Sequence, residues 1–503
     1  MTPIKPWYWR KLPLANRTGS QVFSKLFLCR NSSGKNAGNN YDNGFSNSSG
    51  IATLLESPSP SNFLARYSIC AGSPRTEGDR QLLWTPGIGE ILPFLRDRLQ
   101  SQRAIAKSNQ SDIPDRLPFT GGWLGWLGYD LAWEIERLPL LKPESLPFPV
   151  AYWYEPAEFA IIDSLEETLW LAASEEQTLD AMEQKLELQE LDSEIQKPYV
   201  ESIAEDIFNL APNLAPNLGA NNLEPRFYTS QADYEAAVVK VKKHIEAGDI
   251  FQANISLRFE VNTAAESWRI YRALQQINPS PFASYWQTPW GDTISCSPER
   301  LLRLQGRAAE TRPIAGTRKR GASPEIDYSL EQELIANTKE RAEHIMLVDL
   351  ERNDLGRVCE WGSVRVNELL AIERYSHVMH LVSNVVGTLR PDCDAIDAIR
   401  AMFPGGTITG CPKVRCMEII EELEPVRRNL FYGSCGYIDW RGNLDLNILI
   451  RTLLYLNDPS NPERSLVVGQ VGSGIVADSI PEKEWEESLQ KARAQIYATI
   501  ACL

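Results

Sequence analysis

One segment of the sequence alternates between apolar and polar residues, and this pattern constrains the fold most. From Phe251 to Phe259, apolar side chains take every second position, with Gln252, Asn254, Ser256 and Arg258 between them. Successive side chains of a strand point to opposite faces of a sheet, so the pattern predicts a strand with one face in a core. The other, wholly polar face is turned either to solvent or to a binding cavity.

Two amphipathic helices can be recognised by their spacing. Tyr234, Val238, Val241 and Ile245 recur at helical intervals before the strand, and that helix can end at the glycine that follows. A helix near the C-terminus opens with a capping box at Ser479 and has a buried face formed by its apolar residues Trp485, Leu489, Ala492 and Ile496.

Composition excludes several classes of protein. The 503 residues include 51 Lys and Arg against 66 Asp and Glu, a formal charge of −15, and such a surface repels a nucleic-acid backbone. The nine cysteines are scattered without a C-x-x-C pair, which argues against a zinc site and indicates a reducing compartment. No apolar run approaches the ~18 residues of a membrane helix. We therefore expect a cytoplasmic globular protein that binds neither nucleic acid nor a membrane.

Two stretches of the chain are unsuited to forming a core. Residues 30–50 consist mainly of Asn, Ser and Gly, which predicts a flexible loop. Residues 209–218 (NLAPNLAPNL) lie in a longer irregular stretch that is typical of a boundary between domains. We expect an N-terminal region over residues 1–195, a linker over 196–225 and a C-terminal catalytic domain over 226–503.

The N-terminus is basic and has no acidic residue before Asp42, which resembles a transit peptide. Against this, Trp7–Trp9 predict a buried strand and Thr18–Phe27 a short helix with a polar cap. We therefore expect this segment to belong to the folded protein.

Two glycine-rich segments suggest nucleotide binding, but their spacing excludes it. In Gly405–Lys413 (GGTITGCPK), Cys and Pro follow the last glycine, where a P-loop needs Lys and then Ser or Thr. Gly469–Gly474 (GQVGSG) has the wrong order for a dinucleotide fingerprint. Thr409 and Gly410 nevertheless precede a helix that starts near Pro412, so free N–H groups there either bind an anion or only cap the helix.

Glutamates at helical spacing occur twice. Glu340 and Glu343 are three residues apart in one predicted helix, and Glu484 and Glu487 are three apart in the last one. Such pairs either face solvent or converge on a divalent cation such as Mg²⁺, which prefers oxygen ligands.

Arg451 and His380 each allow a structural and a functional interpretation. The apolar segment Leu444–Leu454 predicts one strand, with Arg451 on the same face as Asp445 and Asn447. There Arg451 either makes a structural ion pair or binds a carboxylate through its planar fork. His380 lies in an amphipathic segment, where a buried structural histidine is the simplest interpretation.

Together these segments resemble the chorismate-utilising enzymes, a family that includes component I of anthranilate synthase, component I of aminodeoxychorismate synthase, and the isochorismate and salicylate synthases. The resemblance covers nearly the whole chain. It is carried by GDIFQANISLRF (248–259), SPERL (297–301), RPIAGTRKRG (312–321), EHIMLVDLERNDLGRV (343–358), HVMHLVSNVVG (377–387), FPGGTITGCPKVRCMEIIEELEP (403–425), LNILIRT (446–452) and GSGIVADSIPEKEWEESLQKARA (472–494). LLES (54–57) and RYSICAG (66–72) further resemble the anthranilate and aminodeoxychorismate branches.

The resemblance implies a two-lobed α+β fold of the anthranilate synthase type, with stacked antiparallel β-sheets flanked by helices. It places Mg²⁺ on Glu343 and Glu487, beside Glu340 and Glu484, where the ion would hold the ring carboxylate of chorismate. Further substrate contacts implied by the family are Thr409 and Gly410 at the ring carboxylate, Arg451, Tyr437, Gly472, Ser473 and Gly474 at the second carboxylate, and Lys491 in support.

The resemblance also assigns chemical roles. Glu299 is the expected general acid for the departing hydroxide, a role that needs a pKa raised by burial. His380 occupies the position linked to the elimination of pyruvate. Relatives that add water carry a Lys base where this chain has Gln252, and an amide cannot take a proton from water, so isochorismate and salicylate synthesis are disfavoured.

Ala315 and Thr317 bear on the identity of the product. Aminodeoxychorismate synthases typically carry a nucleophilic Lys in a P-I-K-G-T motif, whereas this chain reads PIAGT over Pro313–Thr317. Without an amine at Ala315, ammonia itself can attack the ring, and loss of pyruvate then gives anthranilate. Asn254, the motif FPGGTITG and the segment Asn278–Ala283 look more like the aminodeoxychorismate branch, which stays the alternative.

The family also implies an amino-acid effector site at Glu56, Ser57 and Pro281. Residues 278–283 read N-P-S-P-F-A, which departs from the N-P-S-P-Y-M of tryptophan-regulated anthranilate synthases. This departure weakens the case for tryptophan as the effector.

The sequence contains no G-x-C-x-G glutaminase elbow and no Cys/His/Glu triad in the required order. We therefore expect ammonia to come from a separate glutamine amidotransferase subunit, in a hetero-oligomer. A catalytically silent relative that only binds chorismate or an amino acid is a further alternative. It is disfavoured by the intact set of Glu299, His380, Glu343, Glu487 and Arg451.

Overall fold

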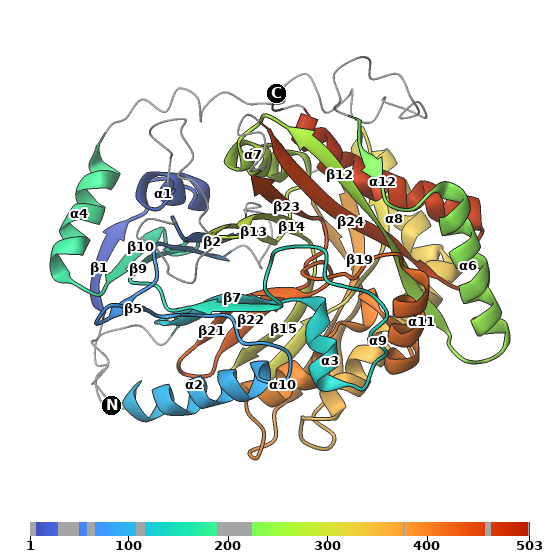
Figure 1. Cartoon of the computed structure of the whole chain (residues 1–503), viewed down its shortest axis with the longest axis horizontal. Helices are drawn as coiled ribbons and strands as arrows, with labels where there is room; N and C mark the ends of the chain where they lie inside the picture. Colours follow the sequence, from blue (N-terminus) through green and yellow to red (C-terminus); the bar gives the residue numbers. More distant parts are fainter. Residues whose placement is uncertain are drawn as a thin grey trace.

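The computed structural model describes residues 7–28, 50–57, 66–106, 116–188, 224–375, 378–457, 464–500 and 502. Nearly all of the predicted flexible loop (30–50) and of the predicted linker (196–225) lies outside these residues. The described part of the chain is built on two large antiparallel sheets (Figure 1).

The first sheet has 12 strands within the described residues. Along one path their order is β1 (Tyr8–Pro13), β10 (Thr168–Ala173), β9 (Glu158–Asp163), β3 (Tyr67–Ala71), β2 (Ala52–Glu56), β13 (Phe282–Thr288), β14 (Gly291–Ser297), β23 (Thr452–Asn457), β24 (Ser465–Ile475), β12 (Gln252–Thr263) and β11 (Arg226–Phe227). The short strand β20 (Gly410–Cys411) pairs with β12 outside this path.

The second sheet has 10 strands within the same residues. Their order is β17 (Ile314–Lys319), β19 (Val378–Thr388), β16 (Ala308–Arg312), β15 (Arg300–Gln305), β22 (Leu444–Asn447), β21 (Ser434–Asp439), β7 (Gly122–Leu127), β8 (Ala151–Tyr154) and β6 (Leu83–Trp84), with β18 (Arg365–Arg374) paired to β19. A small hairpin joins β4 (Thr76–Glu77) and β5 (Arg80–Gln81). Both large sheets contain strands from before and after the predicted linker, joined through β2–β13 in one sheet and β7–β21 in the other.

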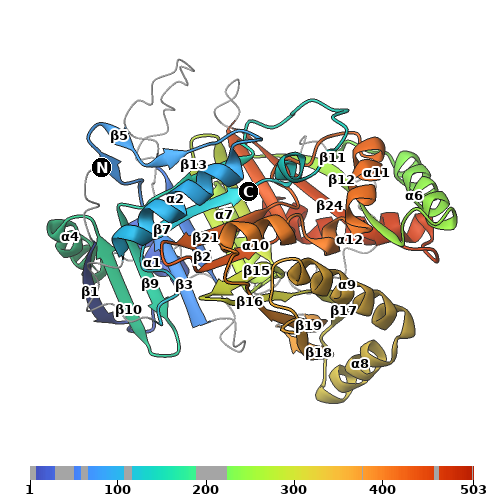
Figure 2. The ribbon, with the colours of Figure 1, turned by 90° about the horizontal axis from the view of Figure 1, so that it is seen from below.

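Helices cover the outer faces of the two sheets (Figures 1 and 2). One hydrophobic core joins the first sheet to α1 (Gly19–Leu26), α4 (Glu176–Glu187), α6 (Gln231–Glu246), α7 (Ser267–Ile277), α11 (Lys413–Leu423) and α12 (Pro481–Ile500). The other core fills the space between the sheets and includes side chains of α2 (Ile91–Ala106), η2 (Tyr129–Leu131), α3 (Ala132–Ile135), α9 (Thr338–Gly356) and α10 (Ala395–Met402). On α8 (Pro324–Ala336), Leu334 packs against β19. The predicted α+β architecture of stacked antiparallel sheets flanked by helices is confirmed.

The polar face of β12 is turned inward and not to solvent. Ala253, Ile255 and Leu257 pack against the helices of the first sheet. Gln252 and Asn254, on the opposite face, are also buried, at 7% and 9% exposure. Of the two alternatives for this alternating strand, the structure therefore selects a polar interior.

Two of the points at which the chain crosses between the two sheets are neighbours. One crossing joins β14 to β15 through residues 298–299, and the other joins β22 to β23 through residues 448–451. Hydrogen bonds tie the crossings together: Ile448 N donates to Glu299 O at 3.0 Å, and Cys296 N donates to Arg451 O at 3.1 Å. The prediction of one strand over Leu444–Leu454 is therefore wrong, because this segment leaves one sheet and enters the other.

Near the N-terminus, the predicted strand and helix form as β1 and α1, and Thr18 caps α1 with a capping box. Trp7 is buried, whereas Tyr8 is 48% exposed, so the strand is buried only in part. Within the described ranges, no helix has the length and apolarity needed to cross a membrane.

Candidate active site

The polar face of β12 lies between two glycine-containing segments. On one edge, β20 pairs with β12 and brings Gly410 opposite Ala253, while Asn254 N donates to Thr409 O at 2.9 Å. On the other edge, β24 brings Gly474 opposite Asn254. The predicted substrate-binding residues Thr409, Gly410 and Gly474 are thus gathered around one strand.

Glycine is required at Gly410 for steric reasons. Its φ is +132°, and an added Cβ would lie 2.1 Å from Gln252 O. At Gly474 an added Cβ would lie 2.5 Å from Gln252 Nε2. Gly410 therefore leaves room for the backbone of Gln252, and Gly474 leaves room for its side chain. The amide oxygens of Gln252 and Asn254 are buried and have no hydrogen-bond partner among the described residues.

Ser473 and Lys491 lie beside this strand in different ways. The Ser473 hydroxyl is 3.0 Å from the hydroxyl of Tyr234 on α6, so its side chain lies on the helix-covered face of the sheet, opposite to Gln252 and Asn254. Lys491 Nζ donates to Gly472 O at 2.9 Å and forms an ion pair with Glu487 at 2.8 Å. Lys491 thus connects the Gly472–Gly474 segment to the glutamates of α12.

Arg451 is a half-buried cation without a carboxylate partner in the described part of the chain. Its φ is +54°, at the crossing between the sheets. Its Nη1 donates to Lys491 O at 3.5 Å, and it makes no ion pair there. Burial lowers the pKa of the Arg451 guanidinium, and the charges of Tyr432 and Glu487 oppose this shift. Such a guanidinium is well suited to bind a ligand carboxylate.

Tyr432 was not predicted from the sequence. Its hydroxyl is buried close to Ser256 on the polar face of β12, without a well-formed hydrogen bond within the described residues. Burial raises its pKa, so the hydroxyl stays protonated. Its φ of +65° shows an irregular backbone, and no periodic pattern in the sequence signals this position.

Tyr437, which was predicted to contact the same carboxylate as Arg451, is placed elsewhere. It belongs to β21, its ring packs on Phe119 at 5.7 Å, and it lines a separate cavity together with Glu56 and Pro281. The tyrosine that acts on the pKa of Arg451 is instead Tyr432.

The four predicted metal ligands lie on α9 and α12, close enough for the charges of the other three to act on Glu343. Burial raises the pKa of Glu343, Lys339 opposes this shift, and the negative charges of Glu484, Glu487 and Glu340 add to it. Glu340 accepts from Arg318 at 2.7 Å through one oxygen, and its other oxygen is buried without a partner among the described residues. Burial would raise the pKa of Glu487, but Lys491, Lys339 and Arg451 hold it below its usual value.

This donor set fits a hard divalent cation. All four groups are carboxylates, one Glu340 oxygen is buried and unpaired among the described residues, and the repulsion that the other three exert on Glu343 favours a cation beside it. In the part of the chain that the structure describes, no group of three or more His, Cys, Asp or Glu side chains is already arranged to hold a metal ion. Arg318 and Lys491 instead pair with Glu340 and Glu487.

Glu299 lies on the crossing between β14 and β15 and is 5% exposed. Burial raises its pKa to about 8, and the charge of Glu351 adds to this, while the Thr407 hydroxyl and the backbone of Ile314 lower it. At neutral pH the side chain therefore carries a proton, as a general acid requires.

His380 and Thr317 are opposite each other on β19 and β17. Thr317 Oγ1 is 2.9 Å from His380 Nδ1. Burial lowers the pKa of His380 to about 4, and the charge of Arg451 lowers it further, while the backbone of Gly316 raises it. The imidazole is therefore neutral at physiological pH.

Ala315 sits on β17 opposite Leu381, next to a bulge at Gly316. Gly316 has a φ of +59°, and a Cβ there would lie 2.5 Å from Glu340 Oε2. Since Ile314 contacts Glu299 and Gly316 contacts both His380 and Glu340, this short strand touches the predicted acid, the histidine and a predicted metal ligand.

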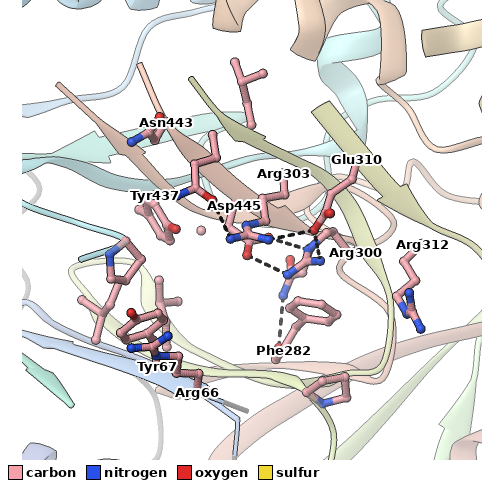
Figure 3. A pocket seen from close by; sticks show the side chains of 18 of the residues that line it. Arg66, Tyr67, Phe282, Arg300, Arg303, Glu310, Arg312, Tyr437, Asn443 and Asp445 are labelled. Atoms are coloured by element: carbon pink, nitrogen blue, oxygen red, sulfur yellow. Dashed lines mark hydrogen bonds and ion pairs between the residues drawn. The ribbon is translucent and has the colours of Figure 1, made fainter. Parts of the chain in front are cut away.

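Two of the three predicted effector residues, Glu56 and Pro281, line a separate cavity of about 430 Å³ (Figure 3). Arginines and carboxylates pair across its wall, as in the ion pairs of Arg300 with Glu310 at 2.8 Å and with Asp445 at 2.9 Å. Pro281 is also part of its lining.

Glu56 lines this cavity at the end of β2. Its carboxylate already accepts hydrogen bonds from the Ser20 backbone at 3.0 Å, from the Tyr271 hydroxyl at 2.7 Å and from Gln275 at 2.5 Å. Glu56 is thus bound within the protein, while the hydroxyl of Ser57 has no partner among the described residues. The effector role stays a prediction.

Comparison with known proteins agrees with the predicted relationship. The family model described as chorismate binding enzyme matches residues 70–497. A Synechocystis protein named anthranilate synthase component I-like protein is 54% identical over 501 residues, covering 98% of this chain and 92% of its own. Aminodeoxychorismate synthase component 1 of Bacillus subtilis is 43% identical, covering 85% and 88%.

A solved structure shows the same fold. Anthranilate synthase component I from Streptococcus pneumoniae superposes with a TM-score of 0.66 at 30% identity, covering 86% of this chain and 93% of that one. The predicted anthranilate-synthase-like architecture is therefore confirmed. Since the family model spans most of the sequence and the relatives cover most of both chains, this chain belongs to the family of chorismate binding enzymes.

Proposed function

We propose that this protein aminates chorismate with loss of pyruvate to give anthranilate, in a reaction that depends on Mg²⁺ and uses ammonia from a separate glutamine amidotransferase subunit. The observation that carries the proposal is Gln252, a buried amide between Gly410 and Gly474 whose oxygen is unpaired among the residues that the structure describes. An amide in this position cannot deprotonate water, but its oxygen can accept a hydrogen bond from ammonia, which is already a nucleophile.

Two anion sites suit the two carboxylates of chorismate. Arg451 is half-buried and without an ion pair among the described residues, so a ligand carboxylate would supply its counter-charge. Glu340, Glu343, Glu484 and Glu487 would hold Mg²⁺. When bound, Mg²⁺ would supply positive charge for the ring carboxylate.

Glu299 would donate a proton to the departing hydroxyl group, so that it leaves as water while ammonia forms the new carbon–nitrogen bond. This step needs a protonated carboxyl at neutral pH, which the raised pKa of Glu299 provides.

His380 would act in the second half of the reaction. Loss of pyruvate makes the ring aromatic and requires a ring carbon to lose a proton. A neutral imidazole can accept that proton, and Thr317 orients the ring through its hydrogen bond to Nδ1.

A second candidate is the synthesis of aminodeoxychorismate, in which the enolpyruvyl group is kept. The 43% identity to the Bacillus subtilis aminodeoxychorismate synthase component favours it. Ala315 favours anthranilate, because the residue on β17 carries no amine that could add to the ring before ammonia.

The two products can be separated in one assay. The purified chain is incubated with chorismate, Mg²⁺ and ammonium chloride, and products are identified by mass and by anthranilate fluorescence, with pyruvate measured in parallel. Anthranilate with one equivalent of pyruvate supports the proposal. An amino product without pyruvate identifies the second candidate, and isochorismate would refute amination altogether.

The source of ammonia is tested by replacing ammonium with glutamine. No product should form unless an amidotransferase subunit is added. Product from glutamine and this chain alone would contradict the proposed division of labour.

A further inference from the structure

A second carboxyl is buried beside the proposed general acid. Glu351, on α9, is 3% exposed, compared with 5% for Glu299. The two side chains lie near consecutive residues of one turn: a Cβ added at Gly406 would lie 3.5 Å from Glu351 Oε1, and the neighbouring Thr407 acts on the pKa of Glu299. They also lie near the point where β16 is followed by β17: Glu351 accepts a hydrogen bond from Thr311 on β16, and Glu299 lies close to the backbone of Ile314 on β17.

Glu351 has no cation of its own among the described residues. Its Oε2 accepts from Thr311 Oγ1 at 3.2 Å. The nearest lysine, Lys413, instead donates to Asp354 Oδ2 at 2.6 Å and to Met402 O at 3.2 Å. The positive charge of Lys413 is therefore directed mainly to Asp354, and within the described ranges Glu351 makes no direct ion pair.

We propose that Glu351 is a positioning residue for Glu299. The two side chains form a buried acid pair, in which Glu351 on α9 keeps Glu299, the carboxyl that faces the substrate, protonated. This inference rests on the proposed role of Glu299 in the amination of chorismate.

The electrostatics of the cluster agree with this role. Two buried carboxyls at close range cannot both ionise without mutual repulsion. Burial raises the pKa of Glu299, and the charge of Glu351 is among the groups that raise it further. For Glu351 itself, burial and the charge of Asp354 raise the pKa, while Lys413 lowers it. Arg357 acts on Asp354 in the same cluster and lowers its pKa.

The test is the replacement Glu351→Gln, which keeps an acceptor for Thr311 and removes the charge. The titration of Glu299 is followed by ¹³C NMR of protein labelled at glutamate carboxyls, with its signal identified by its loss in Glu299→Gln. In Glu351→Gln the titration midpoint of Glu299 should fall by about 1 pH unit. The alkaline limb of chorismate turnover should move by the same amount.

Asp349→Asn is the matched control. Asp349 lies on the same helix, but its side chain is 62% exposed and pairs with Arg352. This variant removes a carboxylate from α9 and should leave the midpoint of Glu299 unchanged. An unchanged midpoint in Glu351→Gln would overturn the proposal, as would an equal shift in Asp349→Asn.

The native protein provides a second measurement that does not depend on whether Glu351→Gln folds. In an acid pair, ionisation of one carboxyl perturbs the signal of the other, so the Glu299 signal should titrate in two steps. A single-step titration contradicts the pairing.

The NMR measurement needs no turnover, so the acid pair and the proposed function can fail separately. A shifted midpoint of Glu299 in a protein that fails to aminate chorismate would refute the proposed function and leave the acid pair intact.

Discussion

Thr317 Oγ1 lies 2.9 Å from Nδ1 of His380, across the antiparallel pair β17–β19. The remaining ring nitrogen is the one that can exchange a proton with a ligand, since a hydrogen bond at one nitrogen fixes the orientation and tautomer of the ring. This contact links the PIAGT motif to the histidine through a single hydroxyl.

Replacing Thr317 with Val should therefore slow the elimination of pyruvate while leaving the binding of chorismate unchanged. A lost hydrogen bond of about 1 kcal/mol corresponds to roughly a fivefold decrease in rate. The measurement is the rate of pyruvate release with saturating ammonium. Thr317→Ser retains the hydroxyl and should behave like the parent, whereas an equal loss in both variants would show that the threonine acts only through packing.

Glu299→Gln should abolish turnover, because an amide cannot donate a proton to the leaving hydroxyl. The loss should reach about 10²–10⁴-fold, the usual contribution of general acid catalysis. Chorismate affinity, measured by calorimetry in the presence of Mg²⁺, should stay close to that of the parent. If the variant no longer binds chorismate, Glu299 holds the structure of the site and is not its acid.

The rate should depend on pH through two groups with shifted pKa values. Glu299 must be protonated, and its pKa of about 8 means that the active form is present at lower pH and disappears as the pH rises through 8. His380 must be neutral, and its pKa of about 4 means that it stays neutral through the range where an ordinary histidine titrates. At a constant concentration of free ammonia, we expect an alkaline limb near pH 8 and no inflection near pH 6.5, where a normal histidine would produce one.

Ala315→Lys should block the formation of anthranilate, because it places an amine on the strand that lies between Glu299 and His380. Ala315→Met adds a side chain of comparable length without the amine and serves as the control. Products are identified by mass and fluorescence. Anthranilate production at the parent rate in Ala315→Lys would show that this side chain does not reach the ring.

Removal of divalent cations with EDTA should stop turnover, and Mg²⁺ should restore it. Glu487→Gln should raise the concentration of Mg²⁺ required for half-maximal activity by at least about tenfold. Glu486→Gln alters the exposed neighbour on α12 and should leave this concentration unchanged. Full activity of Glu487→Gln at the Mg²⁺ concentration sufficient for the parent would remove Glu487 from the metal site.

Local sequence patterns predicted individual elements well. The alternation from Phe251 to Phe259 predicted β12, and the capping residue Thr18 predicted the start of α1. The same alternation did not reveal whether Gln252 and Asn254 face solvent or a cavity. That depends on the second sheet, which is formed by distant segments of the chain.

Errors arose where the backbone leaves regular structure. Leu444–Leu454 reads as one strand because both of its parts are buried, yet Arg451 adopts a positive φ between two sheets. Tyr432 was missed for the same reason. The irregular backbone around it carries no periodicity, and family motifs drew attention to Tyr437 instead.

The two chain crossings determine how the proposed acid and the proposed anion site can move. Glu299 lies on one crossing and Arg451 on the other, and backbone hydrogen bonds join them. A sliding motion of one sheet over the other would therefore displace both residues together. The joined crossings thus hold the backbone of the proton donor and that of the guanidinium in place relative to each other, and substitutions in the core near these crossings can shift both without touching either side chain.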